Sequence, residues 1–152
     1  MTVSELIIRP ALAEDGNRIR DVAQLAYSKY IQRIGQAPAP MVADFESQIK
    51  EQWVKVACCN SVIAGFVVFY PRDDHMHLEN VAVRPQFAGK GIGKQLINHV
   101  ENVALQQGRV AVELYTNEAM TENLAFYPRM GYVEIARKRQ NGFNRVFFRK
   151  EI

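Results

Sequence analysis

The stretch from Val81 to Lys94 constrains the fold more strongly than any other part of the sequence. A β-branched segment passes through a proline into three alternating glycines, Gly89, Gly91 and Gly93. Apolar residues then recur with helical spacing until a glycine at position 108 stops the pattern. A strand, a glycine-rich turn and an amphipathic helix are therefore predicted in direct succession. The apolar stripe of the helix consists of Ile92, Leu96, Ile97, Val100, Val103 and Ala104.

The glycine-rich turn is suited to bind an anion, most naturally a phosphate group. Glycines let the backbone come close to a ligand, and the first N–H groups of a helix point outward with the positive end of its dipole. Arg84, Lys90 and Lys94 add three positive charges with no acidic residue between them. A turn that only packs the helix on the sheet is disfavoured, because three glycines at a helix start lower the helix propensity.

Two common phosphate-binding patterns fit this turn poorly. A Walker loop needs four residues between its glycines and a Ser or Thr after the lysine, whereas Gly89 and Gly93 are separated by three residues and Gln95 follows the lysine. The dinucleotide fingerprint needs G-x-G-x-x-G, and this chain has G-x-G-x-G. Glu113 lies near the place of a ribose-binding acid, so a dinucleotide site is kept as the alternative.

Length and composition predict one globular domain over residues 1–152. Of these residues 48% are hydrophobic and 23% are charged, close to globular averages. The longest apolar run, residues 62–70, is about half a membrane-spanning length, and no secretory signal is visible. A cytoplasmic location without membrane contact is expected. The two cysteines, Cys58 and Cys59, are neighbours, which excludes a disulfide scaffold and a cysteine zinc site.

The C-terminal end of the chain is basic. Residues 129–152 hold seven basic and two acidic side chains, in a chain of net charge +3. Nucleic acid is nevertheless disfavoured as a partner, because no aromatic residues interleave with the run Arg137-Lys138-Arg139. A solvated turn flank is the preferred interpretation of this run.

Hydrophobic periodicity predicts seven strands and four helices in the order β-α-α-β-β-β-α-β-α-β-β. Asn60-Ser61 and Asn141-Gly142 are turn signals that predict hairpins. A hairpin-rich first half followed by a strand-helix-strand crossover predicts a mixed sheet with helices packed on it. Strands are expected at residues 6–9, 53–59, 62–70, 75–83, 110–115, 132–137 and 143–149, and helices at 19–30, 41–52, from 92 to the stop at 108, and 120–127.

Two motifs, in this order along the chain, resemble those of the GNAT N-acetyltransferase superfamily. Gln86, Gly89 and Gly91 fit its Q/R-x-x-G-x-G/A signature. Residues 126–132, Phe-Tyr-Pro-Arg-Met-Gly-Tyr, resemble its later F/L-Y-x-x-x-G-F/Y motif. The expected element order resembles that family over nearly the whole chain. The resemblance implies a single α/β domain with a mixed central sheet of about seven strands and helices on both faces.

The resemblance also implies acetyl-CoA as the acetyl donor, bound in a cleft between splayed parallel strands. Its pyrophosphate would lie on backbone N–H groups of residues 89–94, and its pantetheine arm along the strand before the turn. Where the family often has an Asn seven residues before the motif tyrosine, this chain has Met120, flanked by Asn117 and Asn123. Asn123 is assigned to the cofactor, with Asn117 as the alternative. The expected cofactor contacts are Val81, Val83, Gly89, Lys90, Gly91, Ile92, Gly93, Lys94 and Asn123.

Direct transfer of an acetyl group to a primary amine needs a base for the amine and an acid for the leaving thiolate. Alternation in the strand before the turn places His75, His77 and Glu79 on one face. The resemblance puts Glu79 beside the acetyl group as the base, with Glu113 of the next strand as the second candidate. Tyr127 matches the motif tyrosine and is the expected acid.

The same residues allow other interpretations. His75-x-His77-x-Glu79 has the types of a metal site, but no fourth ligand is evident because the remaining histidine, His99, lies in the helix after the turn. No metal is predicted. A non-catalytic acyl-CoA sensor that kept the cofactor turn is the alternative function. The expected partner is a small-molecule or peptide amine; the identity of that amine, and a homodimer, are left open by the sequence.

Overall fold

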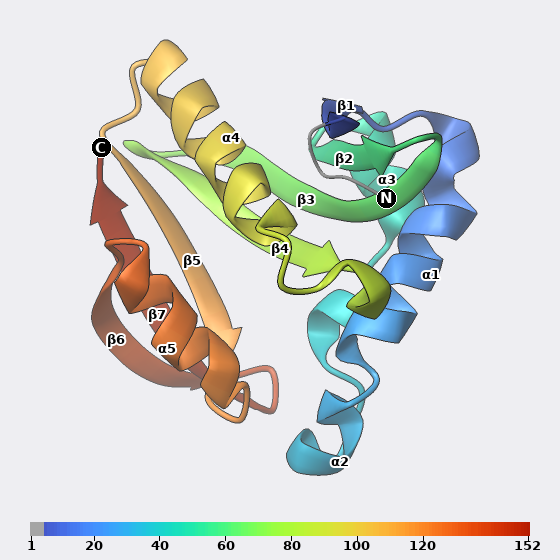
Figure 1. Cartoon of the computed structure of the whole chain (residues 1–152). Coiled ribbons are helices and arrows are strands. Elements are labelled where there is room, and N and C mark those ends of the chain that lie inside the picture. Colours follow the sequence, from blue (N-terminus) through green and yellow to red (C-terminus); the bar gives the residue numbers. More distant parts are fainter. Residues whose placement is uncertain (1–4) are drawn as a thin grey trace. The chain divides into compact units, whose positions relative to one another are not determined.

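The computed structural model of the chain describes residues 5–152, with seven strands and five α-helices in that range (Figure 1). The strands are β1 (Ile7–Pro10), β2 (Val54–Cys59), β3 (Val62–Arg72), β4 (His75–Val83), β5 (Ala111–Asn117), β6 (Val133–Gln140) and β7 (Phe143–Glu151). The α-helices are α1 (Gly16–Tyr27), α2 (Tyr30–Ile34), α3 (Phe45–Lys50), α4 (Ile92–Gln106) and α5 (Thr121–Arg129). Short 3-10 helices lie at Ala13–Asp15, Ala39–Val42 and Pro85–Phe87.

The strands form one mixed sheet in the order β1-β2-β3-β4-β5-β7-β6 within the described residues. β4 and β5 are parallel, with His75 opposite Ala111 and Leu78 opposite Leu114. The pairs β1–β2, β2–β3, β5–β7 and β6–β7 are antiparallel. The predicted fold class, a mixed seven-strand sheet with one parallel crossover through a helix, is confirmed.

Residue contacts divide the chain into two compact units, and β3, β4 and α4 each contribute residues to both. The first unit contains the residues through Phe69 together with Asn80–His99. The second unit contains Tyr70–Glu79 and Val100–Ile152. The expectation that residues 1–152 behave as one domain stays a prediction.

In the first unit, helices cover both faces of β3. The Phe66 ring meets the Phe45 ring of α3 edge to face, with centroids 5.5 Å apart. Gly65 points to the opposite face, because neighbouring strand residues alternate, and a Cβ there would come within 3.4 Å of Leu96 of α4. The strand is accordingly buried from Ile63 to Phe69. Helices on both faces of the sheet, as expected, are found in this unit.

In the second unit, α5 packs on one face of the sheet. The Tyr127 ring of α5 lies 5.8 Å from the Phe148 ring of β7 and 5.8 Å from the Tyr132 ring. Tyr132 donates a hydrogen bond of 2.8 Å to Glu101 of α4. The opposite face of the same strands carries aromatic and ionisable side chains instead of an apolar layer.

The turns follow the sequence signals, whereas the first two expected helices have different bounds in the structure: α1 begins and ends earlier, and α3 is shorter. Asn60-Ser61 and Asn141-Gly142 have positive φ at both central residues, as their hairpins require. The helix expected at 19–30 ends at Tyr27, and α2 is a separate short helix. The helix expected at 41–52 is reduced to α3, because Asp44 caps it by accepting a hydrogen bond from the Ser47 N–H at 3.2 Å.

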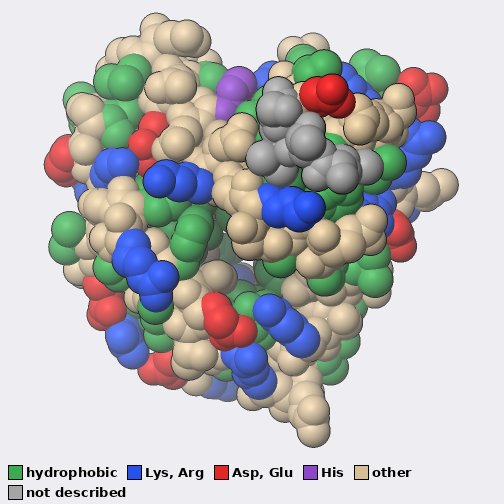
Figure 2. All heavy atoms as spheres, in the orientation of Figure 1, with side chains coloured by type: hydrophobic (Ala, Val, Ile, Leu, Met, Phe, Trp, Pro, Cys, Tyr) green, Lys and Arg blue, Asp and Glu red, His purple; other side chains and the backbone are tan. Residues whose placement is uncertain are grey.

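No helix within residues 5–152 is both long and apolar enough to cross a membrane. On the face drawn in Figure 2, hydrophobic side chains lie in small separate areas among polar and charged ones.

Candidate active site

The glycine turn before α4 exposes its backbone. Gly89 and Gly91 both have φ of +77°, a conformation that glycine adopts without strain. A Cβ at either position would have no described neighbour within 4 Å, so this side of the backbone is open. The first helical bond of α4 runs from the Gln95 N–H to the Gly91 carbonyl at 3.0 Å. The N–H groups before Gln95 therefore point out of the helix end, as anion binding requires.

The other glycines of this region serve packing. A Cβ at Gly65 would lie 2.7 Å from the Ala82 carbonyl oxygen, and one at Gly93 would lie 3.7 Å from the Val83 side chain. Close approach of β3, β4 and α4 thus depends on Gly65 above all. Gly93, expected among the cofactor contacts, sits on the sheet side of the turn.

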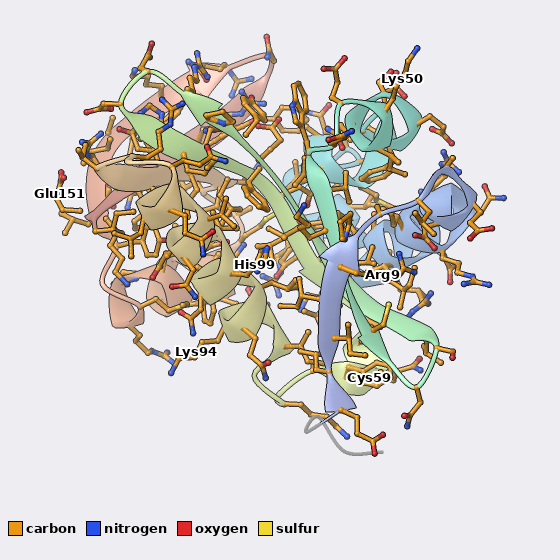
Figure 3. All side chains as sticks on the ribbon, turned by 90° about the horizontal axis from the view of Figure 1, so that it is seen from above. Arg9, Lys50, Cys59, Lys94, His99 and Glu151 are labelled. Carbon is orange, nitrogen blue, oxygen red and sulfur yellow. The ribbon has the colours of Figure 1, made fainter. Side chains whose placement is uncertain are left out.

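The three cations of the turn have different environments. Lys90 and Lys94 are exposed, and Figure 3 shows Lys94 extending outward from α4. Arg84 is paired with Asp21 at 2.8 Å and donates to the Ile63 carbonyl at 2.7 Å. The charge of Arg84 is therefore compensated by Asp21, a residue distant in sequence, and not by a residue of the turn.

A buried tyrosine fixes the end of β4 in the first unit. The Tyr27 hydroxyl oxygen lies 2.7 Å from Asn80 Oδ1 and 2.9 Å from the Val81 carbonyl oxygen. Asn80 in turn donates to the Pro40 carbonyl at 3.2 Å. Val81 and Val83 are half-buried on one face of this fixed strand. Sequence reasoning missed Tyr27 and Asn80; a buried Asn inside an apolar strand was the available signal, since such a side chain needs partners.

In the second unit, the two candidate bases have different partners. Glu79 Oε2 lies 2.6 Å from His77 Nε2. Glu113 Oε2 lies 2.5 Å from Arg149 Nη1 and 3.7 Å from His75 Nδ1. Arg149 also pairs with Asp74 and with Glu151, at 3.2 and 2.8 Å. Glu113 is therefore part of an ion-pair network, whereas Glu79 has a single histidine partner in this unit.

The charges of this network reinforce one another. Hydrogen bonds to Glu151, Asp74 and Glu113 raise the pKa of Arg149. Arg149 and then His75 lower the pKa of Asp74 through hydrogen bonds. Both effects favour the charged forms at neutral pH.

A row of aromatic rings runs across the strands next to Glu79. Ring centroids are 5.2 Å apart for Tyr70 and His77, 5.9 Å for His77 and Tyr115, and 5.5 Å for Tyr115 and Phe147. Such cross-strand rows stabilise a sheet by stacking. Burial, followed by the negative charge of Glu79, raises the pKa of both Tyr70 and Tyr115. The Glu79 carboxylate is thus close to two tyrosines that stay protonated at neutral pH.

The motif tyrosine and its asparagine neighbours lie on the α5 side of the second unit. Tyr127 is buried, 5% exposed, which also fits a core role. Asn123 donates to Thr116 Oγ1 at 3.0 Å, so it is held against β5. Asn117 Oδ1 accepts the Ala119 N–H at 2.9 Å and forms a local turn. Each asparagine thus uses one end of its side-chain amide within the chain, and the choice of Asn123 for a cofactor contact stays a prediction.

The histidine pattern on β4 does not gather into a metal site. His75 Nδ1 faces Asp74 Oδ1 at 3.1 Å, whereas His77 faces Glu79. Within residues 5–152, no three His, Cys, Asp or Glu side chains are placed to hold one ion.

Comparison with known proteins identifies the family. The sequence matches the acetyltransferase (GNAT) family over residues 19–132. The chain belongs to the GNAT family. This match contains both the glycine turn and the tyrosine motif, and it confirms the resemblance and the enzyme class expected from them, an acyltransferase.

Relatives of this GNAT chain include a protein named 5-NmdU N-acetyltransferase from Pseudomonas phage PaMx11, 29% identical over 84% of this chain and 86% of the relative. An uncharacterised N-acetyltransferase of Methanocaldococcus jannaschii is 37% identical over 38% of this chain, and the match spans a quarter (25%) of that relative's length. Among solved structures, the PaiA N-acetyltransferase of Thermoplasma acidophilum, in complex with coenzyme A, has a TM-score of 0.74 at 18% identity, covering 97% of this chain and 99% of that one. This last likeness concerns the fold.

Proposed function

We propose that this GNAT-family chain transfers the acetyl group of acetyl-CoA to a primary amine by direct attack. The observation that carries the proposal is the open backbone at Gly89 and Gly91, at the start of α4. A pyrophosphate there would accept hydrogen bonds from N–H groups of residues 89–94 and meet the charges of Lys90 and Lys94. Coenzyme A in the structure of the PaiA relative supports the assignment.

The rest of the cofactor has candidate partners in each unit. Val81 and Val83 offer a half-buried apolar edge and backbone groups to the pantetheine arm, and Tyr27 holds this end of β4 through the Val81 carbonyl. In the second unit, the side-chain amide of Asn123 donates a hydrogen bond to Thr116. Its Oδ1 atom could then accept a hydrogen bond from the cofactor.

Glu79 is the base that the contacts favour. Glu113 is bound by Arg149, so proton uptake there would disrupt a charged hydrogen bond. Glu79 has His77 as its partner, which orients the carboxylate. In the proposed reaction, Glu79 removes a proton from the amine as nitrogen attacks the thioester carbonyl carbon. The carbon–sulfur bond then breaks, and Tyr127 gives its hydroxyl proton to the CoA thiolate.

The acceptor is proposed to be a small-molecule or peptide amine. The second unit places Glu79 against protonated Tyr70 and Tyr115, an environment that attracts an ammonium group by charge and by cation–π contact. The cytoplasmic location stays a prediction, and the oligomeric state stays open.

The test is acetyl-CoA-dependent thiol release with a panel of polyamines, aminoglycosides, amino acids and peptide N-termini. Turnover with any amine supports the enzyme, whereas acetyl-CoA binding without turnover across the panel indicates the sensor. Tyr127→Phe removes one hydroxyl and almost no volume. We expect single-turnover transfer to slow sharply while acetyl-CoA binding is retained. An unchanged chemical step would remove Tyr127 from the mechanism and leave it a core residue.

A further inference from the structure

Glu101 of α4 is a carboxylate that the proposed reaction does not use. Its Oε2 atom accepts a hydrogen bond from the Tyr132 hydroxyl at 2.8 Å, and its Oε1 atom pairs with Lys150 Nζ at 3.0 Å. The Glu101 side chain is 13% exposed, and Tyr132 is 2% exposed. Burial of a charged group costs free energy unless its partners compensate it. Both partners are therefore needed to hold the carboxylate at this place in the second unit.

Lys150 packs closely against the residues around the carboxylate. Its Nζ lies 5.7 Å from the centre of the Tyr132 ring. A Cβ at Gly131 would lie 3.2 Å from Lys150 Cε, so the lysine passes directly over the backbone that leads from α5 to β6. Glu101, Tyr132 and Lys150 are together called the Glu101 cluster.

The Glu101 cluster holds the outer end of the Tyr132 side chain. Burial and then the negative charge of Glu101 raise the pKa of Tyr132, so its hydroxyl stays protonated and remains a donor. At the other end of the residue, the Tyr132 N–H donates to the Tyr127 carbonyl at 3.1 Å. Because both ends are bound, the ring cannot swing to another rotamer without breaking one of these hydrogen bonds.

Tyr132 in turn packs against Tyr127, the proposed acid. The two rings meet edge to face, with centroids 5.8 Å apart and planes at 71°. The rings of Phe126 and Phe148 also pack on Tyr127, at 5.3 and 5.8 Å. Of these three neighbours, Tyr132 has a hydroxyl that a polar contact can hold in place. A change at Glu101 therefore reaches Tyr127 through Tyr132.

We infer that Glu101 is a positioning residue for the acetyl transfer: through Tyr132, it holds the Tyr127 hydroxyl in the orientation from which its proton reaches the CoA thiolate. The inference rests on the proposed function for the role of Tyr127 as the acid. Proton transfer needs donor and acceptor within roughly 3 Å of each other, and a displacement of about 1 Å can lower a rate about 10²-fold. The contacts that set this orientation thus belong to the machinery of the reaction.

The test is a double-mutant cycle, measured as single-turnover acetyl transfer at saturating acetyl-CoA. Glu101→Gln keeps the size of the side chain but places an uncharged amide beside the Lys150 ammonium. We expect it to slow the wild-type chemical step about tenfold, and to slow Tyr127→Phe by less than about twofold, because the hydroxyl through which it acts is already missing. The same slowing in both backgrounds overturns the inference.

Tyr132→Phe tests the connection between Glu101 and Tyr127. This substitution removes the hydroxyl that Glu101 accepts and keeps the ring. It should slow the chemical step about as much as Glu101→Gln does, and Glu101→Gln/Tyr132→Phe should be no slower than the slower single variant. Effects that multiply in the double variant would show that Glu101 does not act through Tyr132.

Asp15→Asn is the matched control, because Asp15 is another buried carboxylate with a cationic partner. Asp15 pairs with Arg9 at 2.8 Å in the first unit. Both Asp15→Asn and Glu101→Gln should lower the melting temperature, but Asp15→Asn should leave the chemical step within about twofold of the wild type. If Asp15→Asn slows transfer as much as Glu101→Gln does, general loss of stability explains the rate and the inference is wrong.

A spectroscopic measurement detects the orientation of Tyr127 without chemistry. The protein is labelled with 3-fluorotyrosine and saturated with CoA, and the fluorine resonance of Tyr127 is identified by its absence in Tyr127→Phe. Glu101→Gln should shift or broaden this resonance, whereas Asp15→Asn should leave it unchanged. A Tyr127 resonance that Glu101→Gln does not alter contradicts the inference, whatever the activity of the enzyme.

These measurements distinguish failure of the inference from failure of the proposed function. An unchanged chemical step in Tyr127→Phe removes Tyr127 as the acid, and the inference about Glu101 is overturned with it. A slowed step in Tyr127→Phe, combined with a Glu101→Gln variant that transfers acetyl groups at the wild-type rate, overturns the inference alone. A slowed step in both single variants, without further slowing when they are combined, supports the positioning role.

Discussion

The turn before α4 and the ring-bearing face of the second unit, which we propose as the cofactor and acceptor sites, are built in different ways. In the turn, Gly89 and Gly91 present backbone with open space beside it. On the ring-bearing face, side chains from several strands form the surface, among them Tyr70, His77 and Tyr115. A site made of backbone requires few residue types, whereas a site made of side chains can change with every substitution. The turn therefore suits an unvarying cofactor, and the sheet face suits an acceptor specific to this protein.

The same contrast separates the two carboxylates of the second unit. Glu113 belongs to a network of fixed charges with Arg149 and Asp74, and Glu79 lies beside the aromatic row with His77. Glu113 is thus held by ion pairs, whereas Glu79 is the carboxylate that we propose as the base.

The largest expected effect is that of Glu79→Gln, which keeps size and hydrogen bonding but cannot take up a proton. Turnover should fall by roughly 10²–10⁴-fold, the usual contribution of general base catalysis, with acetyl-CoA affinity little changed. Glu113→Gln is the matched control: it should lower stability by breaking the pair with Arg149 and leave the chemical step nearly intact. Steady-state and single-turnover rates across pH check both variants. The reverse result would assign the base to β5.

The next effect concerns the turn. Gly91→Val places a β-branched residue at φ of +77° and directs its side chain into the space next to the backbone. Acetyl-CoA at 100 times its Kd should stabilise the wild type by about 2.7 kcal/mol, and this shift should largely vanish in the variant. Differential scanning calorimetry with and without acetyl-CoA measures it.

Gly108→Val is the control for Gly91→Val, at the opposite end of α4. Gly108 has φ of +74° and, as at Gly91, a Cβ added there would have no described atom within 4 Å. Both substitutions should lower the melting temperature, but Gly108→Val should keep the acetyl-CoA shift. Equal retention of the shift in both variants would show that the turn does not hold the cofactor.

The contrast between the two regions also explains what the sequence could predict. The glycine turn is contiguous, so its residues, its dipole and its strand–helix context could be recognised within Val81–Lys94. The two hairpin turns were equally local. The basic residues of β6 lie beside β7, and their neighbours there are distant from them in sequence or face them across the hairpin. The run Arg137-Lys138-Arg139 has no interleaved aromatics in sequence, yet Lys138 meets the Phe147 ring across the strand pair. Pairing register, which sequence periodicity does not specify, creates this neighbourhood.

Partners that are distant in sequence were missed for the same reason. Asp21 compensates Arg84, and Arg149 engages Glu113, each through contacts that only the fold brings together. Sequence alternation correctly placed His77 and Glu79 on one face, because both lie on one strand.

The smallest expected effect compares histidines of the two units. His75 and His77 have carboxylate partners, whereas His99 of α4 packs against the Phe69 ring, and no described group forms a hydrogen bond with its buried Nε2 atom. Figure 3 shows His99 on α4.

Burial and then the charge of Lys55 lower the pKa of His99, so the unfolded chain binds the proton more tightly than the folded protein does. The free energy of unfolding should therefore fall as pH drops below about 6.5, the unfolded value, and stop falling once pH is below the lower native pKa. His99→Leu should remove this part of the pH dependence. Urea unfolding at pH 8 and at pH 5 measures the free energy of unfolding of both proteins. The variant should gain stability relative to the wild type at pH 5 only. A constant difference between the two proteins across that range would mean that His99 does not titrate as an uncompensated buried group, and the distinction between the units would then be limited to their ligand sites.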